Sequence, residues 1–378
     1  MSTYPVKLLS CDTHLEHWPT AMKDYIPEKY HDLFEKGPAA CKAHGWLPHY
    51  GEDGVPLAVL AGYRNFWEVR KGVIDVKNMK IPGAYGGPDE YAQWMRMSGI
   101  TTAVILPGGG FGSTIGVARG TLDKEGYLAV LQGYNNYAND FCLAYPDQFI
   151  GGACLPTTGI DDAIAEMRRV RNKLPGLRTV SPAAFPNGSS TPLPEDDRFY
   201  AEALDLAMPI TLHGGISGPW GIKTDRDTAV WIIGHVELPT GGPYSATQLI
   251  CSGVFDRFPK LRFIVLEAGA GWLPFSMDVM DHFWDRQRYW AGLELKNPPS
   301  WYCTSGNLLW NIICDKTAVR MRDVIGVDNL SWSSDFPHGN SEWPEDASRA
   351  MKLLANVTAE ERHKILWANA ARFYGLEA

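Results

Sequence analysis

Residues 6–14 read VKLLSCDTH, an apolar run that ends in an aspartate and a histidine. Two further apolar runs end in residues that can bind metal, PITLH at residues 209–213 and NLSWSSDFPH at residues 329–338. Each run is typical of a buried strand with its polar groups at the carboxyl end. In a closed parallel barrel these ends meet at one face, so distant parts of the chain can bind one ion. The residues expected to meet there are Asp12, His14, His213 and Asp335.

Strand and helix patterns alternate along the rest of the chain. Further strands are predicted at residues 101–106, 149–155, 177–185, 262–267 and 308–314. Helices are predicted at residues 120–144, 161–173, 197–207, 244–252, 273–290 and 318–325. The glycines at 108–110 lack the lysine and hydroxyl residue of a phosphate-binding loop, and we interpret them as a flexible loop. Roughly eight strands separated by helices favour a parallel (β/α)8 barrel over a sandwich or a bundle.

The length of the chain fits a single domain. A barrel with insertions accounts for 378 residues as well as two domains would. Residues 18–92 contain many proline, glycine and aromatic residues and show no sustained periodicity, which is typical of a long insertion. We therefore expect one domain over residues 1–378, with the insertion 18–92 after the first strand covering the barrel mouth.

The composition argues against several classes of function. The net charge is −8 and the 35 basic residues are scattered along the chain, so no nucleic-acid partner is expected. No apolar stretch approaches the ~18 residues of a membrane helix, and the N-terminus carries no secretory pattern. The seven cysteines are dispersed, as in proteins of a reducing compartment. These features predict a cytoplasmic protein that acts on a small molecule.

The four strand-end residues form a ligand set of mixed type. Asp12 and His14 are two positions apart on a strand, so their side chains point to the same side. His213 adds an imidazole and Asp335 a carboxylate, and this combination of nitrogen and oxygen suits Zn²⁺, Mn²⁺ or Fe²⁺. We expect one divalent ion with a coordination position left for water or substrate.

The motifs DTH at 12–14, LHGG at 212–215 and SDFPHG at 334–339 resemble the metal motifs of the amidohydrolase superfamily, in its amidohydrolase-2 branch. The stretches GVFDRFPKL at 253–261 and KILWANAARFYGL at 364–376 are also similar to that branch. It includes aminocarboxymuconate semialdehyde decarboxylase and the resorcylate-type decarboxylases. The resemblance implies a distorted TIM barrel whose divalent metal is held by Asp12, His14, His213 and Asp335. The reactions it implies are hydrolysis, non-oxidative decarboxylation and hydration, with metal-dependent oxygenation in one unusual branch.

Three features depart from the pattern of these relatives. Glu267 occupies the place of a histidine in the decarboxylases, and it cannot donate a hydrogen bond as an imidazolium would. His17 stands where many relatives have a glutamate. The strand at 177–185 contains no lysine, so a carbamylated lysine that bridges two metals is not expected.

The remaining candidate residues concern catalysis, a second metal and substrate binding. Asp335 or Glu267 is the candidate proton carrier. His235 follows the strand that ends at His213 and is a candidate pocket residue. A second ion would use Glu16, His17, Glu267 and His338, with Glu267 as a possible bridge; alternatively, His17 and His338 orient the carboxylates of the first site. Substrate-binding candidates are Arg64, Trp18 and Trp220, although these residues could equally have packing or capping roles.

Two enzymatic readings and one non-enzymatic reading remain open. The leading hypothesis is hydrolysis or lyase chemistry on a small carboxylate-bearing molecule, assisted by the metal. The alternative is a dinuclear iron or manganese oxygenase on the same barrel, favoured by the carboxylate-rich ligand set without a bridging lysine. A third possibility is a non-catalytic partner subunit, which the presence of all four core ligands disfavours. By resemblance, a homodimer or a pairing with a related barrel subunit is expected.

Overall fold

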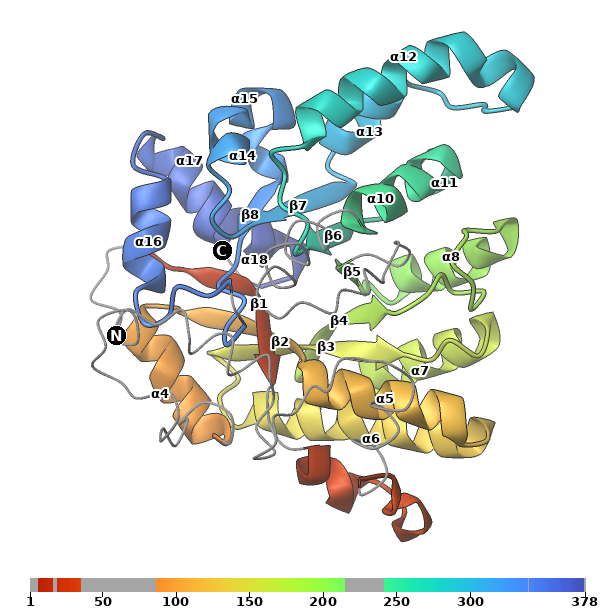
Figure 1. Ribbon diagram of the computed structural model, residues 1–378, viewed down its shortest axis with the longest axis vertical. Helices are drawn as coiled ribbons and strands as arrows, with labels where there is room; N and C mark the ends of the chain where they lie inside the picture. Colours follow the sequence, from red (N-terminus) through yellow and green to blue (C-terminus); the bar gives the residue numbers. More distant parts are fainter. Residues whose placement is uncertain (1–5, 16–18, 35–85, 215–240, 339, 377–378) are drawn as a thin grey trace, which may run out of the picture. The chain divides into compact units, whose positions relative to one another are not determined.

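A computed structural model describes residues 6–15, 19–34, 86–214, 241–338 and 340–376. Within these residues, eight strands form one sheet in the order β1-β2-β3-β4-β5-β6-β7-β8, and every recorded pairing is parallel (Figure 1). Helices connect the successive strands. This order and connectivity are those of the TIM (β/α)8 barrel, as the sequence predicts.

The strands lie close to their predicted positions. Their bounds are β1 Leu9–Leu15, β2 Thr102–Pro107, β3 Phe149–Leu155, β4 Leu177–Pro182, β5 Ile210–His213, β6 Phe263–Leu266, β7 Leu308–Ile312 and β8 Leu330–Trp332. The first strand continues past Cys11, so Asp12 and His14 lie inside β1 rather than after it. Its register against β2 shifts between Ser10 and Thr13, which is a bulge-like irregularity next to the candidate metal ligands.

The helices between the strands are mostly short. In chain order they are α4 Pro88–Ser98, α5 Gly109–Thr121, α6 Lys124–Leu143, α7 Ile160–Lys173, α8 Asp197–Asp205, α10 Gly241–Cys251, α11 Val254–Arg257, α12 Leu273–Ala291, α13 Pro299–Thr304, α14 Lys316–Arg320, α15 Arg322–Ile325, α16 Asp346–Leu353, α17 Ala359–His363 and α18 Asn369–Phe373. Short 3-10 turns are η1 Pro19–Tyr25, η2 Glu28–Tyr30, η4 Pro194–Asp196 and η6 Val327–Asn329, and η7 Lys364–Ala368 is a π-helical turn. None of the helices in the described ranges is long and apolar enough to span a membrane.

Two sequence-based expectations about secondary structure were wrong. The helix expected at 318–325 is two short helices, α14 and α15, separated at Met321. The glycines at 108–110 do not form a loop, because α5 begins at Gly109. Glycine-rich segments have low helix propensity, so local sequence disfavours this helix. Buried side chains on the same segment, Phe111, Val117 and Ala118, provide the packing that stabilises it.

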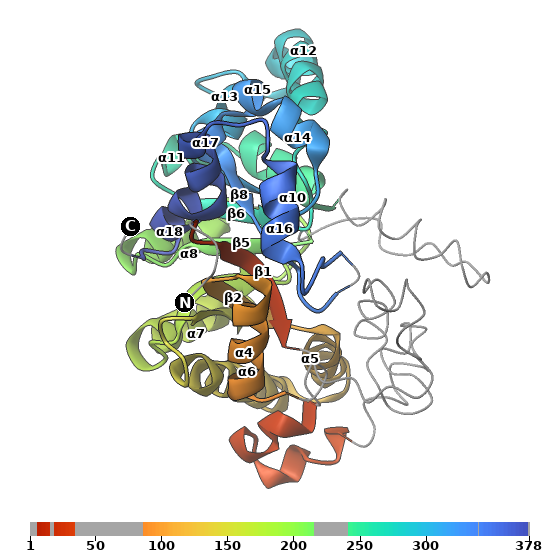
Figure 2. The ribbon, with the colours of Figure 1, turned by 90° about the vertical axis from the view of Figure 1, so that its left-hand side faces the viewer.

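The chain divides into two compact units. The first contains Met1–Cys154, Arg169–Arg178 and Ser333–Met351, and the second contains Leu155–Arg168, Thr179–Trp332 and Lys352–Ala378. In the first unit, α5 and α6 pack against each other, and α5 packs on β2 (Figure 2). In the second unit, β5, β6, β7 and β8 form a continuous run of paired strands with fully buried centres. Only part of the predicted insertion 18–92 lies within the described residues.

Candidate metal centre

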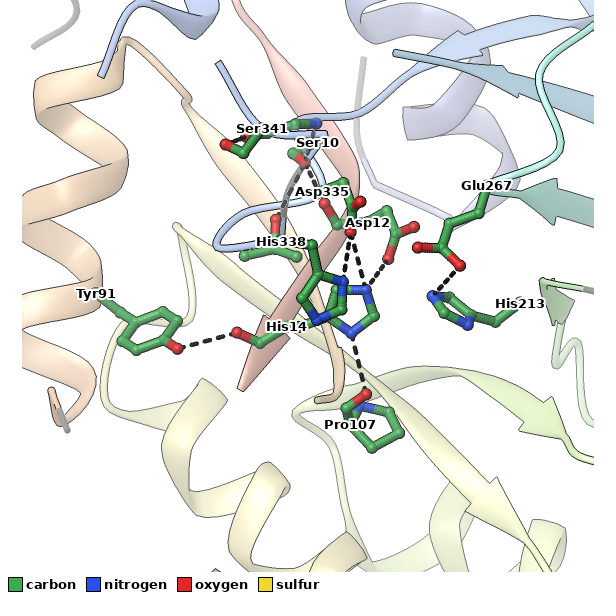
Figure 3. Close-up of polar contacts among 12 residues, drawn as sticks. Ser10, Asp12, His14, Tyr91, Pro107, His213, Glu267, Asp335, His338 and Ser341 are labelled. Carbon is green, nitrogen blue, oxygen red and sulfur yellow. Dashed lines mark hydrogen bonds and ion pairs between the residues drawn. The ribbon is translucent and has the colours of Figure 1, made fainter. Parts of the chain in front are cut away.

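Four side chains that can bind metal gather in the first unit (Figure 3). Nε2 of His14 lies 3.0 Å from Oδ1 of Asp12 and 3.2 Å from Oδ1 of Asp335. Nδ1 of His338 lies 3.0 Å from the same oxygen of Asp335, and its ring stacks on that of His14 with 3.9 Å between centroids. Asp12 and Asp335 are fully buried and His14 is 1% exposed, whereas the side chain of His338 is 19% exposed. His338 is therefore the solvent-facing member of this cluster.

Backbone hydrogen bonds hold the two ligand-bearing segments together. The N–H of Asp335 donates to the carbonyl oxygen of Asp12 at 3.0 Å, and the N–H of His14 donates to that of Phe336 at 2.7 Å. Ser10 adds a side-chain link, because its hydroxyl donates to the Asp12 carbonyl and accepts from the N–H of Ser334. Residues 333–338 thus extend along β1 and place the Asp335 carboxylate beside the Asp12 carboxylate and the His14 imidazole of β1.

The hydrogen bonding of His14 fits a metal ligand. Its Nδ1 lies 3.0 Å from the carbonyl oxygen of Pro107, which can only accept, so Nδ1 carries a proton. In the neutral ring, Nε2 then presents a lone pair towards the oxygens of Asp12 and Asp335. Three acceptors facing one another in a buried place need positive charge, either a proton on Nε2 or a cation between them. Carboxylates with an imidazole oriented by a carbonyl are a donor set that suits Zn²⁺, Mn²⁺ or Fe²⁺.

The electrostatics of the cluster reflect the same need for positive charge. Burial and the neighbouring His338 lower the pKa of His14, but the charge of Asp12 and the hydrogen bonds to Asp12 and Asp335 outweigh them and raise it to about 10. Burial raises the pKa of Asp335, but His338 and the hydrogen bonds from both imidazoles outweigh it and hold the pKa below its usual value. A proton on His14 and a metal ion are thus alternative ways to neutralise these carboxylates.

Two further candidate ligands lie together in the second unit. Nε2 of His213, at the end of β5, is 3.6 Å from Oε2 of Glu267 (Figure 3). The register explains this proximity, because His213 pairs with Leu266 at the end of β6 and Glu267 follows directly. The Glu267 side chain is 7% exposed and that of His213 is 28% exposed, so this pair is open to solvent on the imidazole side.

Both Asp335 and Glu267 adopt unusual backbone conformations. Of the described residues other than glycine, only Ala207, Glu267 and Asp335 have positive φ, at 48°, 54° and 57°. Left-handed backbone costs free energy for such residues and is concentrated at functional sites. Two of the three positions bear candidate catalytic carboxylates, which supports a functional role for both.

The turn after Glu267 is held by a carboxylate that the sequence analysis did not single out. Oδ2 of Asp315 accepts hydrogen bonds from the N–H groups of Ala270 and Gly271 at 2.8 and 2.7 Å. A Cβ at Gly271 would lie 2.7 Å from Oδ1 of Asp315, so only glycine allows this approach. Asp315 also caps α14 by accepting from Ala318, which is the local signal that could have identified it.

A buried polar network supports the segment that carries Asp335. The hydroxyl of Ser334 donates to Oδ1 of Asp346 at 2.8 Å, and the hydroxyl of Ser98 donates to the other oxygen of the same carboxylate. Burial raises the pKa of Asp346 to about 6, although the bonds from Ser98 and Ser334 act to lower it. Ser98 is 248 positions from Asp346 and Ser334 is 12 positions away, so no local pattern indicates the role of Asp346.

Six residues proposed from the sequence lie outside the described ranges. They are Glu16, His17, Trp18, Arg64, Trp220 and His235. The candidate second metal site is therefore represented in the structure only by Glu267 and His338.

Comparison with known proteins places these motifs in context. The sequence profile of the family described as Amidohydrolase matches residues 11–376. Gamma-resorcylate decarboxylase from Rhizobium sp. is 27% identical over 272 residues, covering 68% of this chain and 79% of that protein. The 2-amino-3-carboxymuconate-6-semialdehyde decarboxylase of Dictyostelium discoideum is 25% identical over 272 residues, covering 70% and 72%.

Solved structures agree on the fold. The manganese-bound 5-carboxyvanillate decarboxylase of Novosphingobium aromaticivorans superposes with a TM-score of 0.67 at 15% identity, covering 98% of both chains. An amidohydrolase from Mycobacterium avium subsp. paratuberculosis superposes with a TM-score of 0.70 at 16% identity over 100% of both chains. At these identities the similarity concerns the fold.

Proposed function

The chain belongs to the amidohydrolase family, and from this premise we propose that it is a metal-dependent lyase that removes carbon dioxide from a small aromatic or unsaturated carboxylate. The observation that carries the proposal is the buried cluster of Asp12, His14 and Asp335, whose acceptors face one another. The similarity to gamma-resorcylate decarboxylase and to 2-amino-3-carboxymuconate-6-semialdehyde decarboxylase supports lyase chemistry.

In this proposal Asp12, His14, Asp335 and His213 are the ligands of the first metal. The first three are adjacent within one unit. His213 is included because it ends β5 of the same parallel sheet, and the carboxyl ends of barrel strands form the active face of such enzymes. The bound ion, proposed to be manganese by analogy with the carboxyvanillate decarboxylase, supplies positive charge next to the substrate carboxylate.

A side chain of the protein must deliver one proton to the substrate. Decarboxylation breaks the bond between the ring carbon and the carboxylate, leaves the electron pair on that carbon and requires a proton there. We assign this proton to Asp335, because its carboxylate is buried and lies 3.0 Å from the partly exposed imidazole of His338, which can exchange protons with solvent. Glu267 is the second candidate, since it lies beside His213 and its backbone has a left-handed conformation that costs free energy.

The remaining predicted residues complete the proposal. Arg64, Trp18, Trp220 and His235 are proposed to contact the substrate, and Glu16, His17, Glu267 and His338 would hold a second ion if one binds. We also propose a homodimer or a pairing with a related barrel subunit, and a cytoplasmic location. A single domain with the insertion 18–92 over the barrel mouth is likewise a proposal.

Product analysis tests the reaction type. The protein is incubated with Mn²⁺ and either 2,6-dihydroxybenzoate or 5-carboxyvanillate, and carbon dioxide release is measured together with deuterium incorporation in D2O. We expect one carbon dioxide per substrate consumed and one deuterium on the carbon that lost the carboxylate. Hydrolysis of a separately supplied ester or lactone, with no carbon dioxide released from either acid, would instead indicate a hydrolase. Oxygen consumption would indicate the dinuclear oxygenase, which the decarboxylase relatives do not support.

A further inference from the structure

Helix α4 presents a buried face to the first unit. Its buried residues are Tyr91, Ala92, Trp94, Met95 and Ser98. Tyr91 and Ser98 are two turns apart, so at about 3.6 residues per turn they lie on the same side of the helix. This side therefore carries two hydroxyl groups among mainly apolar residues. Buried hydroxyl groups form hydrogen bonds, and the bonds of these two lead to the candidate metal centre.

The hydroxyl of Tyr91 holds the main chain of a candidate ligand. It donates to the carbonyl oxygen of His14 at 3.0 Å (Figure 3). The N–H of His14 donates to Phe336, and its Nδ1 donates to the carbonyl oxygen of Pro107. Both main-chain polar groups and the ring of His14 are thus held by hydrogen bonds. The bond from Tyr91 is the one of these three that a side-chain substitution can remove.

The ring of Tyr91 is fixed separately by packing. Tyr91 is fully buried, and its ring meets those of Phe141 and Phe336 edge-on, with centroids 5.4 and 5.8 Å apart. A phenylalanine at this position keeps the ring and can keep both contacts. The substitution Tyr91→Phe therefore separates the effect of the hydroxyl from that of the packing.

The hydroxyl of Ser98 reaches the other ligand-bearing segment through Asp346. It donates to Oδ2 of Asp346, and Oδ1 of the same carboxylate accepts from the hydroxyl of Ser334 at 2.8 Å. Ser334 directly precedes Asp335 in the chain. All three members of this chain of hydrogen bonds are buried. A buried carboxylate that accepts from two segments fixes them relative to each other.

The chain between Asp335 and Asp346 also returns to α4. Nε1 of Trp343 donates to the carbonyl oxygen of Trp94 on α4 at 3.1 Å. The rings of both tryptophans pack on Phe336, with centroids 6.1 Å away for Trp94 and 5.7 Å away for Trp343. One helix therefore contacts both segments that carry the candidate ligands.

We propose that α4 positions the metal centre, with Tyr91 and Asp346 as positioning residues for His14 and Asp335. This proposal rests on the metal centre of the proposed function. Ligands bind an ion tightly when their spacing is already correct, because less of the binding free energy is then needed to order them. A single helix that is bonded to both segments supplies this spacing. Neither Tyr91 nor Asp346 is a ligand in this assignment.

Removal of single hydroxyl groups tests the two links separately. The Mn²⁺ affinity of the full-length, metal-free protein is measured by isothermal titration for the wild type, Tyr91→Phe and Ser334→Ala. Partners that orient metal ligands typically contribute about tenfold or more to metal affinity, so each variant should bind Mn²⁺ at least about fivefold more weakly. The number of ions bound per chain should stay the same.

Two matched controls lose hydrogen bonds of the same type away from the candidate ligands. Tyr145→Phe removes the hydroxyl that donates to Oδ1 of Asp89 on α4 at 2.9 Å. Ser348→Ala removes the hydroxyl that donates to the carbonyl oxygen of Glu345 at 2.9 Å. Both controls should bind Mn²⁺ like the wild type, whereas a general loosening of the structure would affect them as well.

Two further measurements separate positioning from stability. Urea unfolding of the metal-free protein reports stability alone, and a purely structural role would lower it without changing Mn²⁺ affinity. The visible absorption of bound Co²⁺ reports ligand geometry, and it should change in Tyr91→Phe but not in Tyr145→Phe. Wild-type Mn²⁺ affinity in either Tyr91→Phe or Ser334→Ala would overturn the proposal. A wild-type protein that binds no Mn²⁺ would overturn the proposed function as well, so the two failures are distinguishable.

Discussion

The backbone N–H of Asp335 donates to the carbonyl oxygen of Asp12 at 3.0 Å, although the two residues come from opposite ends of the chain. This bond sets the spacing of their carboxylates on either side of His14 Nε2. The candidate metal centre is therefore built on main-chain geometry, which side-chain substitution at a candidate ligand should leave in place. Variants of the ligands can accordingly be interpreted as changes in chemistry.

Asp335→Asn keeps the size of the side chain and the backbone bond but removes the charge. We expect Mn²⁺ binding to weaken at least about tenfold, because a neutral amide is a poor substitute for a carboxylate ligand. Isothermal titration and the metal content after gel filtration measure this loss. Added Mn²⁺ should raise the melting temperature of the wild type but not of this variant.

The control for the metal experiment is Asp205→Asn, which changes an exposed carboxylate in the same way. It should bind Mn²⁺ like the wild type. Full metal retention by Asp335→Asn would remove Asp335 from the ligand set.

Asp315→Ala should disturb the turn that presents Glu267. The variant loses the acceptor for Ala270, Gly271 and Ala318, so we expect a loss of about 2–3 kcal/mol in unfolding free energy. If Glu267 takes part in catalysis, kcat should also fall at least about tenfold with little change in KM. Denaturant unfolding and steady-state kinetics measure the two effects.

Gly271→Ala should disturb the same turn by adding an atom instead of removing an acceptor. Its Cβ would lie 2.7 Å from Asp315 and 2.8 Å from Cβ of Thr317, so it should reproduce the kinetic defect. Gly112→Ala is the matched control, because no atom lies within 4 Å of the added Cβ. Normal kcat in both turn variants would show that the turn does not position a catalytic group.

The sequence predicted β3 and β5 with their observed bounds, because uninterrupted apolar runs are local signals. It also predicted that Asp12, His14 and Asp335 lie close together, since parallel topology relates distant strand ends. Local signals could not indicate α5, whose glycines form a helix through packing. Nor could they indicate Asp346, whose role depends on Ser98 and Ser334 approaching it in the folded chain.

Asp346 should make stability depend on pH. Burial raises its pKa from 3.8 to about 6, so the folded protein binds a proton that the unfolded chain releases between these values. Stability from this group is complete below pH 3.8 and is lost as pH rises through 6, and the shift corresponds to about 3 kcal/mol. Asp346→Asn removes this titration.

The relevant quantity is the difference in unfolding free energy between wild type and Asp346→Asn, measured in urea across pH 4–7.5. It should change by up to about 3 kcal/mol in favour of the variant as pH rises. Glu345→Gln, a neighbouring partly exposed carboxylate, serves as the control. A pH-independent difference for Asp346→Asn would mean that this carboxyl group does not titrate in that range.

Glu267→Gln tests the largest departure from the decarboxylase pattern. The amide keeps the volume but cannot take up a proton, and it lacks the negative charge that the carboxylate places 3.6 Å from His213 Nε2. We expect kcat to fall at least about tenfold with KM changed by less than about threefold, because the carboxylate acts on the reaction more than on binding. Glu294→Gln, at an exposed position in the same unit, should have normal kinetics.

Glu267→His separates proton transfer from simple occupancy of the position. A histidine can carry a proton and can donate or accept a hydrogen bond, whereas glutamine cannot exchange a proton. If position 267 takes part in proton transfer, Glu267→His should retain more activity than Glu267→Gln. Equal and nearly complete activity in both variants, together with an Asp335→Asn that stays inactive even when its metal site is saturated with excess Mn²⁺, would assign the proton to Asp335 alone.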